Sequence, residues 1–491
     1  MIPLLSSIPF LVHFSLSVLA AVRLLYRKLA VNTTLVWLFL LFGLPVVGVV
    51  LYILFGDHRL GRQRMQMSER LRSFFMQVFS IDAASIPPDI ARIPRYAALS
   101  RSIQADTGFP VLTGLSPSFY ADAGDLYAAM QADIDAASDS IFLEFYILDP
   151  AGRVADVLAA VERAALRGVD CKILADDFGS KALFRTHWPK RLRKAGVRIV
   201  RSLRVNLFSS FFRRSDLRNH RKILVCDQHV GYVGSYNLAD PKLFKADRGV
   251  GEWVDMMMRV EGPVVDALKS VCLSDYLFDS VGHQIGRADL NALTIKRRDE
   301  TAASLDAGTP VSMQVLPSGP EMRNSTIYEV LVSAIFSAQR RLRIVSPYFI
   351  PDPAVQLALV SAAKRGIEVE IIVPERLDSR LAQFASQSSY RELLRAGVRL
   401  IRYRGGLLHT KLVLVDDEIA LFGTLNIDVR SFHLNLELTM VIYDAATSAT
   451  LWQHSDAYLA NSTPLDLDGW EQRPEWHKFL ENILRLASPI L

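Results

Sequence analysis

The 491-residue sequence contains only three cysteines, Cys171, Cys226 and Cys272, and no Cys-x-x-Cys pair. This scarcity excludes a disulfide scaffold and a cysteine-based zinc site, and it favours a reducing compartment. The sequence also lacks a Walker-type phosphate loop, a Gly-x-Gly-x-x-Gly dinucleotide loop and a Gly-x-Ser-x-Gly nucleophile elbow. The sequence therefore gives no sign of nucleotide binding or of a serine hydrolase, and we expect no cofactor and no metal.

The low charge and high apolar content of the chain limit the classes of protein to which it can belong. Half of the residues are apolar, 22% are charged, and the mean hydropathy is +0.20. Such a chain has ample surface to bury, which excludes a mostly disordered protein. Its length predicts two or three folded units, and its positive mean hydropathy suggests a membrane part.

Two apolar stretches open the chain, at about residues 8–26 and 35–55. The second has 21 residues without a charge, which is long enough to cross a hydrocarbon layer of about 30 Å. We therefore predict a transmembrane helical hairpin over residues 1–56, followed by a basic juxtamembrane segment and linker at 57–110. Five arginines follow the second stretch against three basic residues in the turn, so the positive-inside rule places the remainder in the cytoplasm.

Beyond residue 110 the sequence alternates strand-like and helix-like patterns, and their order repeats. An Ala-Gly-Val-Arg sequence recurs at 195–198 and 396–399, each time before a predicted strand. Copies about 200 residues apart are too distant for a solenoid and indicate two similar α/β domains. We assign these domains to residues 111–281 and 311–491, with a linker at 282–310.

Both copies carry the same polar residues at the same spacing. A lysine lies two residues after a histidine, an aspartate follows the lysine by five, and an asparagine follows the histidine by seventeen. The first set is His220, Lys222, Asp227 and Asn237, and the second is His409, Lys411, Asp416 and Asn426. Ser235 and Thr424, each after a glycine, precede the asparagines by two residues. Recurrence in both copies makes the pattern a strong functional signal.

This duplicated pattern resembles the phospholipase D superfamily, and its wider context resembles bacterial cardiolipin synthases with two membrane spans. The matching segments include Leu51–Gly56, Glu144–Ile147, Asn219–Lys222, Ser346–Pro351, Asn426–Phe432 and Ser488–Leu491. The resemblance implies an α/β fold in which two phospholipase D-like domains, each a mixed β-sheet flanked by helices, pack around a shared active site. It also implies transfer of a phosphatidyl group between two phosphatidylglycerol molecules through a phosphohistidine, giving cardiolipin and glycerol.

The residue types suit that chemistry. One neutral imidazole attacks phosphorus while the other, protonated, gives its proton to the departing alkoxide, and we prefer His220 as nucleophile and His409 as acid/base. The two lysines, the two asparagines, Ser235 and Thr424 are expected to hold the phosphoryl oxygens. Strand alternation turns both motif aspartates away, so we interpret them as structural groups that bind backbone or arginine.

The histidines also require orienting acceptors. The family resemblance suggests Asp255 and Glu437, which lie 35 and 28 residues after the histidine of their own copy.

A basic segment precedes the first motif. Residues 185–222 contain thirteen Lys or Arg against one acid, which favours an anionic phospholipid partner at a membrane. Four other functions remain compatible with these motifs: a phospholipase, a phosphatidylserine synthase, a nuclease, and a non-catalytic lipid-binding scaffold. The apolar hairpin argues against a nucleic-acid partner, and two complete motifs argue against the scaffold. We expect a bacterial inner-membrane protein whose catalytic domains are cytoplasmic.

Overall fold

The computed structural model describes residues 2–26, 31–44, 46–56, 62–79, 90, 93–204, 216–280, 308–322 and 325–486. The expected linker at 282–310 lies almost entirely outside the described residues, as does the middle of the basic segment. The three cysteines are buried and free. The domain limits given above stay predictions.

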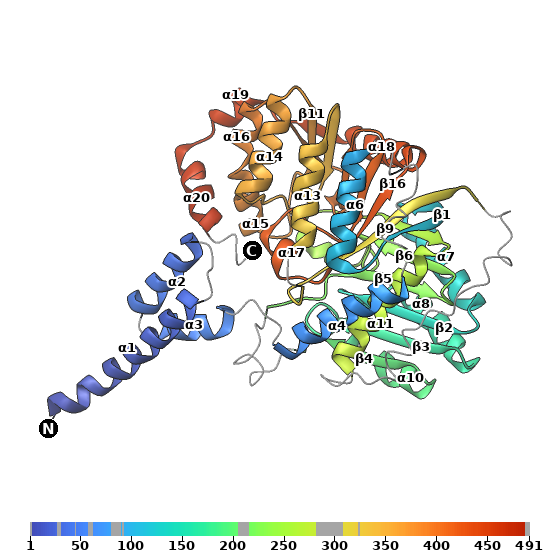
Figure 1. Cartoon of the computed structure of the whole chain (residues 1–491), viewed down its shortest axis with the longest axis horizontal. Helices are drawn as coiled ribbons and strands as arrows, with labels where there is room; N and C mark the ends of the chain where they lie inside the picture. Colours follow the sequence, from blue (N-terminus) through green and yellow to red (C-terminus); the bar gives the residue numbers. More distant parts are fainter. Residues whose placement is uncertain are drawn as a thin grey trace.

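A duplicated set of elements follows residue 110 (Figure 1). The first half consists of β1 (Val111–Tyr120), α7 (Ala123–Ala136), β2 (Ser140–Phe145), α8 (Val154–Leu166), β3 (Asp170–Asp176), α9 (Lys181–Phe184), α10 (Trp188–Lys194), β4 (Arg198–Ser202), β5 (Lys222–Cys226), β6 (Val230–Gly234), β7 (Trp253–Val254), β8 (Met257–Glu261) and α11 (Val264–Ser280).

The second half repeats this order except around the motif, where β13 and α17 are present and β7 has no counterpart, and it adds elements at its end. It consists of β9 (Pro310–Ser318), α13 (Thr326–Ser337), β10 (Arg341–Val345), α14 (Pro353–Lys364), β11 (Glu368–Pro374), α15 (Arg380–Gln387), α16 (Tyr390–Arg395), β12 (Arg399–Tyr403), β13 (Leu407–Leu408), β14 (Leu412–Val415), β15 (Ile419–Gly423), α17 (Val429–His433), β16 (Glu437–Tyr443), α18 (Ala445–Leu459), β17 (Ser462–Pro464), α19 (Leu467–Glu471) and α20 (Glu475–Leu486).

One mixed sheet of 15 strands joins the halves, in the order β17-β12-β11-β10-β14-β15-β16-β9-β1-β8-β6-β5-β2-β3-β4. Outward from the antiparallel pair β1/β9, the two halves show the same succession, and only β17 has no counterpart. The prediction of a duplicated mixed α/β fold is therefore confirmed.

The sheet folds back on itself so that its two halves face each other. Strands β5 and β14, which follow the two motif lysines, are seven positions apart and would lie about 34 Å apart in a flat sheet. Instead β6 lies against β15 and β16, and β5 and β14 share one hydrophobic core. The ring centroids of Phe119 and Phe422 are 5.6 Å apart across this interface. Residues 111–115 of β1 pair with β9, residues 118–120 pair with β8, and the β1/β8 register shifts between Leu115 and Ser118, an irregularity that typically increases local twist.

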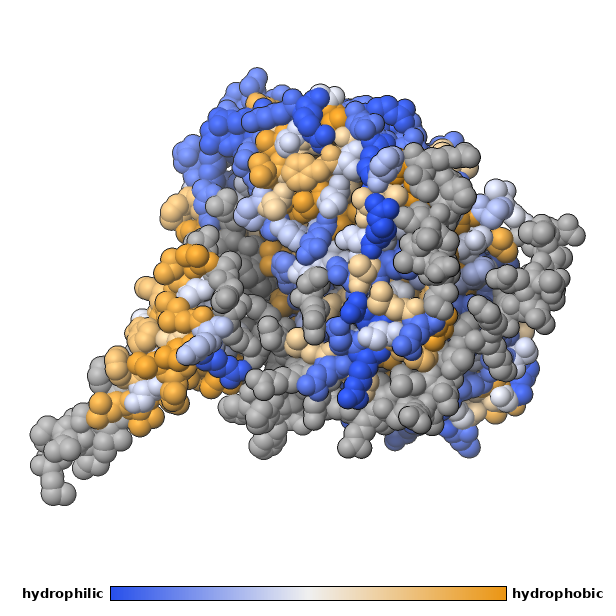
Figure 2. Space-filling view, viewed as in Figure 1, coloured by the Kyte–Doolittle hydropathy of each residue, from blue (hydrophilic) through white to orange (hydrophobic). Residues whose placement is uncertain are grey.

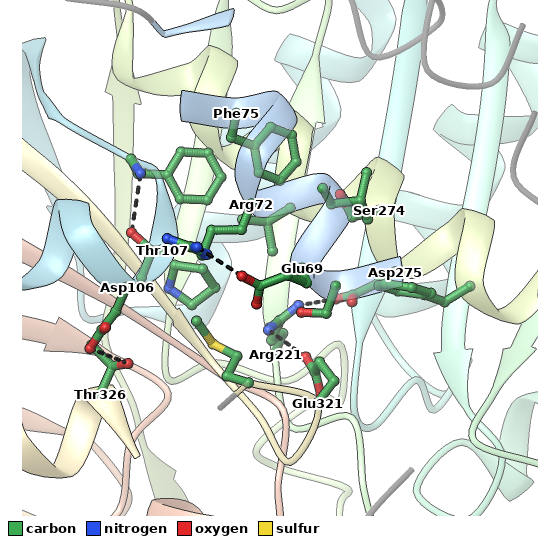
Figure 3. A pocket seen from close by; sticks show the side chains of 17 residues that line it. Glu69, Arg72, Phe75, Asp106, Thr107, Arg221, Ser274, Asp275, Glu321 and Thr326 are labelled. Atoms are coloured by element: carbon green, nitrogen blue, oxygen red, sulfur yellow. Dashed lines mark hydrogen bonds and ion pairs between the residues drawn. The ribbon is translucent and has the colours of Figure 1, made fainter. Parts of the chain in front are cut away.

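The described part of the segment at 57–110 contains two helices that pack on the domains. Helix α4 (Arg62–Val78) adds its apolar side chains to the core that contains α11, and α6 (Pro94–Thr107) packs against α13. Arg64, expected as a juxtamembrane charge, is 1% exposed and pairs with Asp279 at 3.0 Å. Helices α4 and α11 and the end of α6 border a cavity (Figure 3).

The N-terminal apolar stretches form three packed helices, α1 (Ile2–Tyr26), α2 (Val31–Gly43) and α3 (Val47–Phe55). They share a small core, yet many of their other apolar side chains are exposed, as the orange projection in Figure 2 shows. The expected second span is thus divided between two helices, since α2 ends at Gly43 and α3 begins at Val47. Within the described ranges, no helix has both the length and the apolar character that crossing a bilayer requires.

Candidate active site

Each motif histidine lies where the main chain of one half pairs with the other half. The amide of His220 donates to the carbonyl of Leu436 at 2.9 Å, and the amide of Leu436 donates back to the carbonyl of Arg218 at 2.9 Å. In the second motif, β13 pairs in parallel with β7, and the amide of His409 donates to the carbonyl of Val254 at 2.7 Å. Both motifs are therefore anchored by short β-type contacts across the interface.

These contacts place a carboxylate of the opposite half on each imidazole. His220 Nδ1 lies 2.9 Å from Glu437 Oε2, and His409 Nδ1 lies 2.7 Å from Asp255 Oδ1. Each histidine is therefore oriented by the acid of the opposite half rather than by the one that follows it in its own copy. This exchange arises because the chain just before each acid, at β7 and at Leu436, pairs with the opposite half beside its motif histidine.

Burial controls the protonation of the four groups. Burial lowers the pKa of His220 and that of His409 to about 4, against the opposing attraction of Glu437 and Asp255. Burial alone would raise the pKa of each carboxyl, but the adjacent histidine and lysine charges outweigh it and leave both pKa values lowered. A neutral imidazole facing an ionised carboxylate must donate from Nδ1, so the lone pair of each ring lies on Nε2.

The two lysines lie within electrostatic reach of both histidines. Lys222 and Lys411 are buried, and each Nζ donates at 2.6 Å to the carbonyl of the histidine two residues earlier. Burial lowers the pKa of Lys222 to about 8 and that of Lys411 well below its usual range. The charge of Lys411 also lowers the pKa of His220, and that of Lys222 lowers the pKa of His409. The two motifs therefore share one electrostatic environment.

Both asparagines are buried, but they differ in their hydrogen-bond partners. Asn237 Oδ1 accepts from the amide of Ile147 at 3.2 Å. Asn426 is 4% exposed, and its Oδ1 has no hydrogen-bond partner among the described residues. Because rotating the amide exchanges its oxygen and nitrogen, Asn426 can present either an acceptor or a donor to a bound group.

Ser235 and Thr424 do not occupy the phosphate-facing positions expected from the sequence. The Thr424 hydroxyl donates to Glu437 Oε2 at 2.6 Å, while the Ser235 hydroxyl bonds to the main chain of Met256 and lowers the pKa of Asp255. Each follows the glycine that ends a strand, and the neighbouring strand begins at the acid (Glu437) or two residues after it (Asp255), so the hydroxyl lies near the carboxylate.

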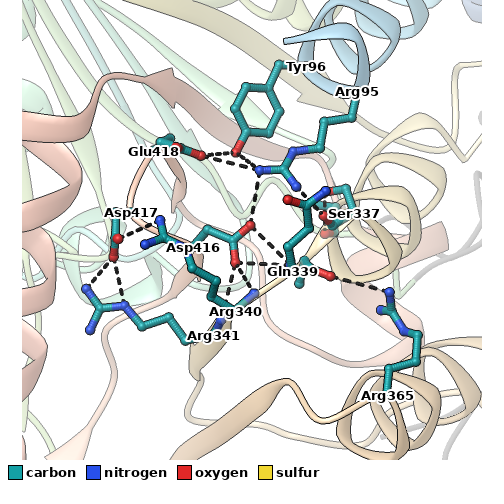
Figure 4. Close-up of polar contacts among 12 residues, drawn as sticks. Arg95, Tyr96, Ser337, Gln339, Arg340, Arg341, Arg365, Asp416, Asp417 and Glu418 are labelled. Carbon is teal, nitrogen blue, oxygen red and sulfur yellow. Dashed lines mark hydrogen bonds and ion pairs between the residues drawn. The ribbon is translucent and has the colours of Figure 1, made fainter.

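The motif aspartates hold the starts of neighbouring strands. Asp227 accepts from the amides of Ser138, Asp139 and Ser140 at 2.7–2.8 Å before β2. Asp416 accepts from the amides of residues 339–341 before β10 and from Arg95 at 3.2 Å (Figure 4). Both carboxylates thus connect the motif strand to the adjacent antiparallel strand.

Replacing Asp416 by alanine is expected to destabilise the protein by about 2–4 kcal/mol, because three amides and Arg95 lose a buried, charged acceptor. Urea unfolding in detergent measures this change in the free energy of unfolding. Asp417→Ala is the control, since Asp417 forms only half-exposed ion pairs with Arg340 and Arg341 and should cost less than about 1 kcal/mol. Equal stability of the two variants would contradict the structural role.

Each motif histidine also contacts an aromatic ring, which the sequence did not predict. The ring of Tyr146 lies 5.1 Å from that of His220, and the ring of Trp253 lies 4.5 Å from that of His409. Trp253 lies two residues before Asp255, so an aromatic residue beside that acid was an available signal, whereas Tyr146 is distant in the sequence from Glu437. No group of three or more potential metal ligands is present in the described part of the chain.

Comparisons with known proteins agree with this geometry. A family model described as "Cardiolipin synthase, PLD-like domain" matches residues 130–250 and 331–459, and one described as "Phospholipase_D-nuclease N-terminal" matches residues 15–56. Proteins named Cardiolipin synthase A from Yersinia pseudotuberculosis and Yersinia pestis are 37% identical over 476 residues, which is 96% of this chain and 95% of each relative.

The crystal structure of phosphatidylserine synthase from Haemophilus influenzae matches with a TM-score of 0.58 at 16% identity. The match covers 80% of this chain and 100% of that chain, and it supports the fold alone. The duplicated fold, the family match over both halves and the full-length similarity lead to one conclusion: the chain belongs to the cardiolipin synthase family of phospholipase D-like proteins.

Proposed function

We infer that the protein is a cardiolipin synthase, a phosphatidyltransferase that converts two phosphatidylglycerol molecules into cardiolipin and glycerol. The observation that carries this proposal is the pair of buried histidines, each oriented by a carboxylate of the opposite half within a chain of this family. Two imidazoles with Nε2 lone pairs and two buried lysines suit the exchange of one oxygen substituent on phosphorus for another.

The first step uses His220 as the nucleophile. Its Nε2 attacks the phosphorus of one phosphatidylglycerol, the bond from phosphorus to the headgroup glycerol breaks, and His409 donates a proton to the departing alkoxide. The anionic phosphodiester offsets the lysine charges that lower the pKa of His409 in the free protein, so substrate binding favours the imidazolium that this step needs. The products are glycerol and phosphatidyl-His220.

The second step reverses the proton transfer. Neutral His409 takes the proton from a headgroup hydroxyl of the second phosphatidylglycerol, the oxygen attacks phosphorus, and the bond to His220 breaks. Lys222, Lys411, Asn237 and Asn426 hold the phosphoryl oxygens through both steps. Burial of the site disfavours water as the competing acceptor.

The exposed apolar surface of α1–α3 supports association with the bacterial inner membrane, where the lipid substrates reside. We propose that this N-terminal part anchors the protein and that the catalytic halves face the cytoplasm, as the distribution of arginines predicts.

Purified protein added to phosphatidylglycerol vesicles is expected to release one glycerol for each cardiolipin formed. Thin-layer chromatography and an enzymatic glycerol assay measure the two products. Phosphatidic acid as the main product would identify a hydrolase, and phosphatidylserine formed only after serine and CDP-activated lipid are added would identify a different acceptor and donor. Either result contradicts the proposal, and an inactive protein in all three assays would favour a scaffold.

A further inference from the structure

Arg221, the middle residue of the first His-x-Lys motif, contacts the chain that holds the orienting acid. Strand alternation turns its side chain away from the faces of His220 and Lys222, and it is 3% exposed. Its Nε donates to the carbonyl of Glu437 at 3.0 Å, and its Nη2 donates to the carbonyl of Ser318 at 3.1 Å.

Two acids hold this guanidinium from the other side. Arg221 forms an ion pair with buried Asp275 of α11 and lies 3.9 Å from Glu321 Oε1. A guanidinium presents five donors in a rigid plane, so these contacts fix its orientation as well as its charge. Through the carbonyl of Glu437, this fixed group determines where the Glu437 backbone lies.

We propose that Arg221 is a positioning residue for the transfer reaction: it fixes the Glu437 main chain and thereby the carboxylate that orients His220. This inference rests on the proposed function, because it assigns Arg221 to the same reaction. The side chain reaches only backbone and acids, so its effect on the reaction passes through Glu437.

The second motif contains a corresponding contact. Thr410 stands between His409 and Lys411 as Arg221 stands between His220 and Lys222, and its hydroxyl donates to the carbonyl of Val254 at 3.3 Å. Val254 immediately precedes Asp255, the acid that orients His409. In both motifs, the middle residue therefore holds the main chain at or beside the acid of the opposite half. Burial alone does not explain a contact that recurs in both halves with different chemistry.

A cavity gives experimental access to Arg221. Figure 3 shows Arg221, Asp275 and Glu321 in the wall of a cavity of about 270 Å³ that also touches Glu69 and Arg72 of α4. Glu321 Oε2 has no hydrogen-bond partner among the described residues, although Glu321 is 6% exposed. If the Arg221 side chain is removed, a small alkylguanidinium can therefore enter and find the same acids and carbonyls.

Arg221→Ala is expected to lower kcat about 100-fold with little change in KM, since a misplacement of about 1 Å at the reacting group costs a factor of this size. Added methylguanidinium should raise the kcat of the Arg221→Ala protein at least about tenfold, and the increase should saturate with its concentration. Methylammonium, which lacks the planar donors, should not raise it. A merely structural loss would not respond to the added guanidinium.

Arg343→Ala is the matched control. Arg343 is equally buried, and its side chain bonds to Glu370, Ser455 and Asp456 rather than to a motif histidine or to the chain that holds an orienting acid. Its kcat per folded molecule should stay near that of the parent protein and should not respond to methylguanidinium. A kcat for Arg221→Ala within about threefold of the parent, an equal loss in Arg343→Ala, or absence of rescue in a folded Arg221→Ala protein would overturn the proposal.

Should Arg221→Ala fail to fold, Arg221→Lys decides the question. Lysine keeps the charge beside Asp275 but cannot make the two carbonyl contacts together, so kcat should still fall, and unchanged turnover overturns the proposal. Turnover of bis(4-nitrophenyl) phosphate is measured in parallel. A parent protein that cleaves this diester without making cardiolipin would contradict the proposed function, while the Arg221 comparison would still be decided on the soluble substrate.

Discussion

A His409→Ala protein incubated with phosphatidylglycerol is expected to accumulate a phosphatidyl adduct on His220, whereas a His220→Ala protein is expected to form none. The proposed acid/base role of His409 is needed most in the second step, where a neutral hydroxyl must lose its proton before it attacks phosphorus. The nucleophile role of His220 has no substitute, because the adduct is bonded to its ring. Overall turnover should fall at least about 10⁴-fold in both variants.

Quenching in alkali, which preserves phosphohistidine, followed by peptide mass spectrometry locates the adduct. An adduct on His409 in the His220→Ala protein would reverse the assignment of the two roles. Absence of an adduct from both variants and from the parent protein under rapid quenching would contradict covalent transfer. Asp417→Ala is the control, since its exposed ion pairs lie away from the motif histidines.

Glu437→Gln is expected to lower kcat about 10³–10⁴-fold, the loss typical of an orienting carboxylate replaced by an amide. The amide can turn its NH₂ toward Nδ1 and thereby favour the tautomer whose Nε2 carries the proton, which cannot attack phosphorus. Because the two partners belong to different halves, this change in the second half should slow adduct formation on the histidine of the first half.

The pH dependence of kcat/KM provides a second measurement of the same contact. Activity should fall with decreasing pH as His220 takes up a proton near its pKa of about 4. The Glu437 charge raises this pKa against the effect of burial, so Glu437→Gln should move the acid limb to lower pH while the plateau drops. Glu370→Gln is the control, since Glu370 is equally buried but pairs with Arg343. An unmoved acid limb, or a loss no greater than that of Glu370→Gln, would contradict the pairing.

Much of the fold and the motif residues could be predicted because both depend on short-range patterns in the sequence. Alternating strand and helix patterns and a repeat of about 200 residues indicated a duplicated α/β protein, and the shared spacing singled out His220 and His409. Contacts between segments far apart in the sequence had no such local signal. The exchanged acids depend on pairing across the interface at Leu436 and Val254, which spacing within one copy cannot reveal.

The packing of helices α4 and α6 likewise depends on contacts with distant segments, which the local sequence does not reveal. Composition marked the segment around them as basic, but Arg64 and the apolar face of α4 find partners on α11, more than 200 residues later. Ser235 and Thr424 were placed on the phosphate because a hydroxyl after a glycine can reach a ligand. The register between neighbouring strands turned both hydroxyls toward the acids instead.

The exchanged carboxylates bear on how a duplicated gene of this kind can change. A protein that kept each histidine beside its own acid would contain a complete oriented histidine in each half. Here a substitution at Glu437 is expected to impair His220, and one at Asp255 to impair His409, so a change in either half affects the other. The two copies have become mutually dependent, and selection must act on them as a single inherited unit.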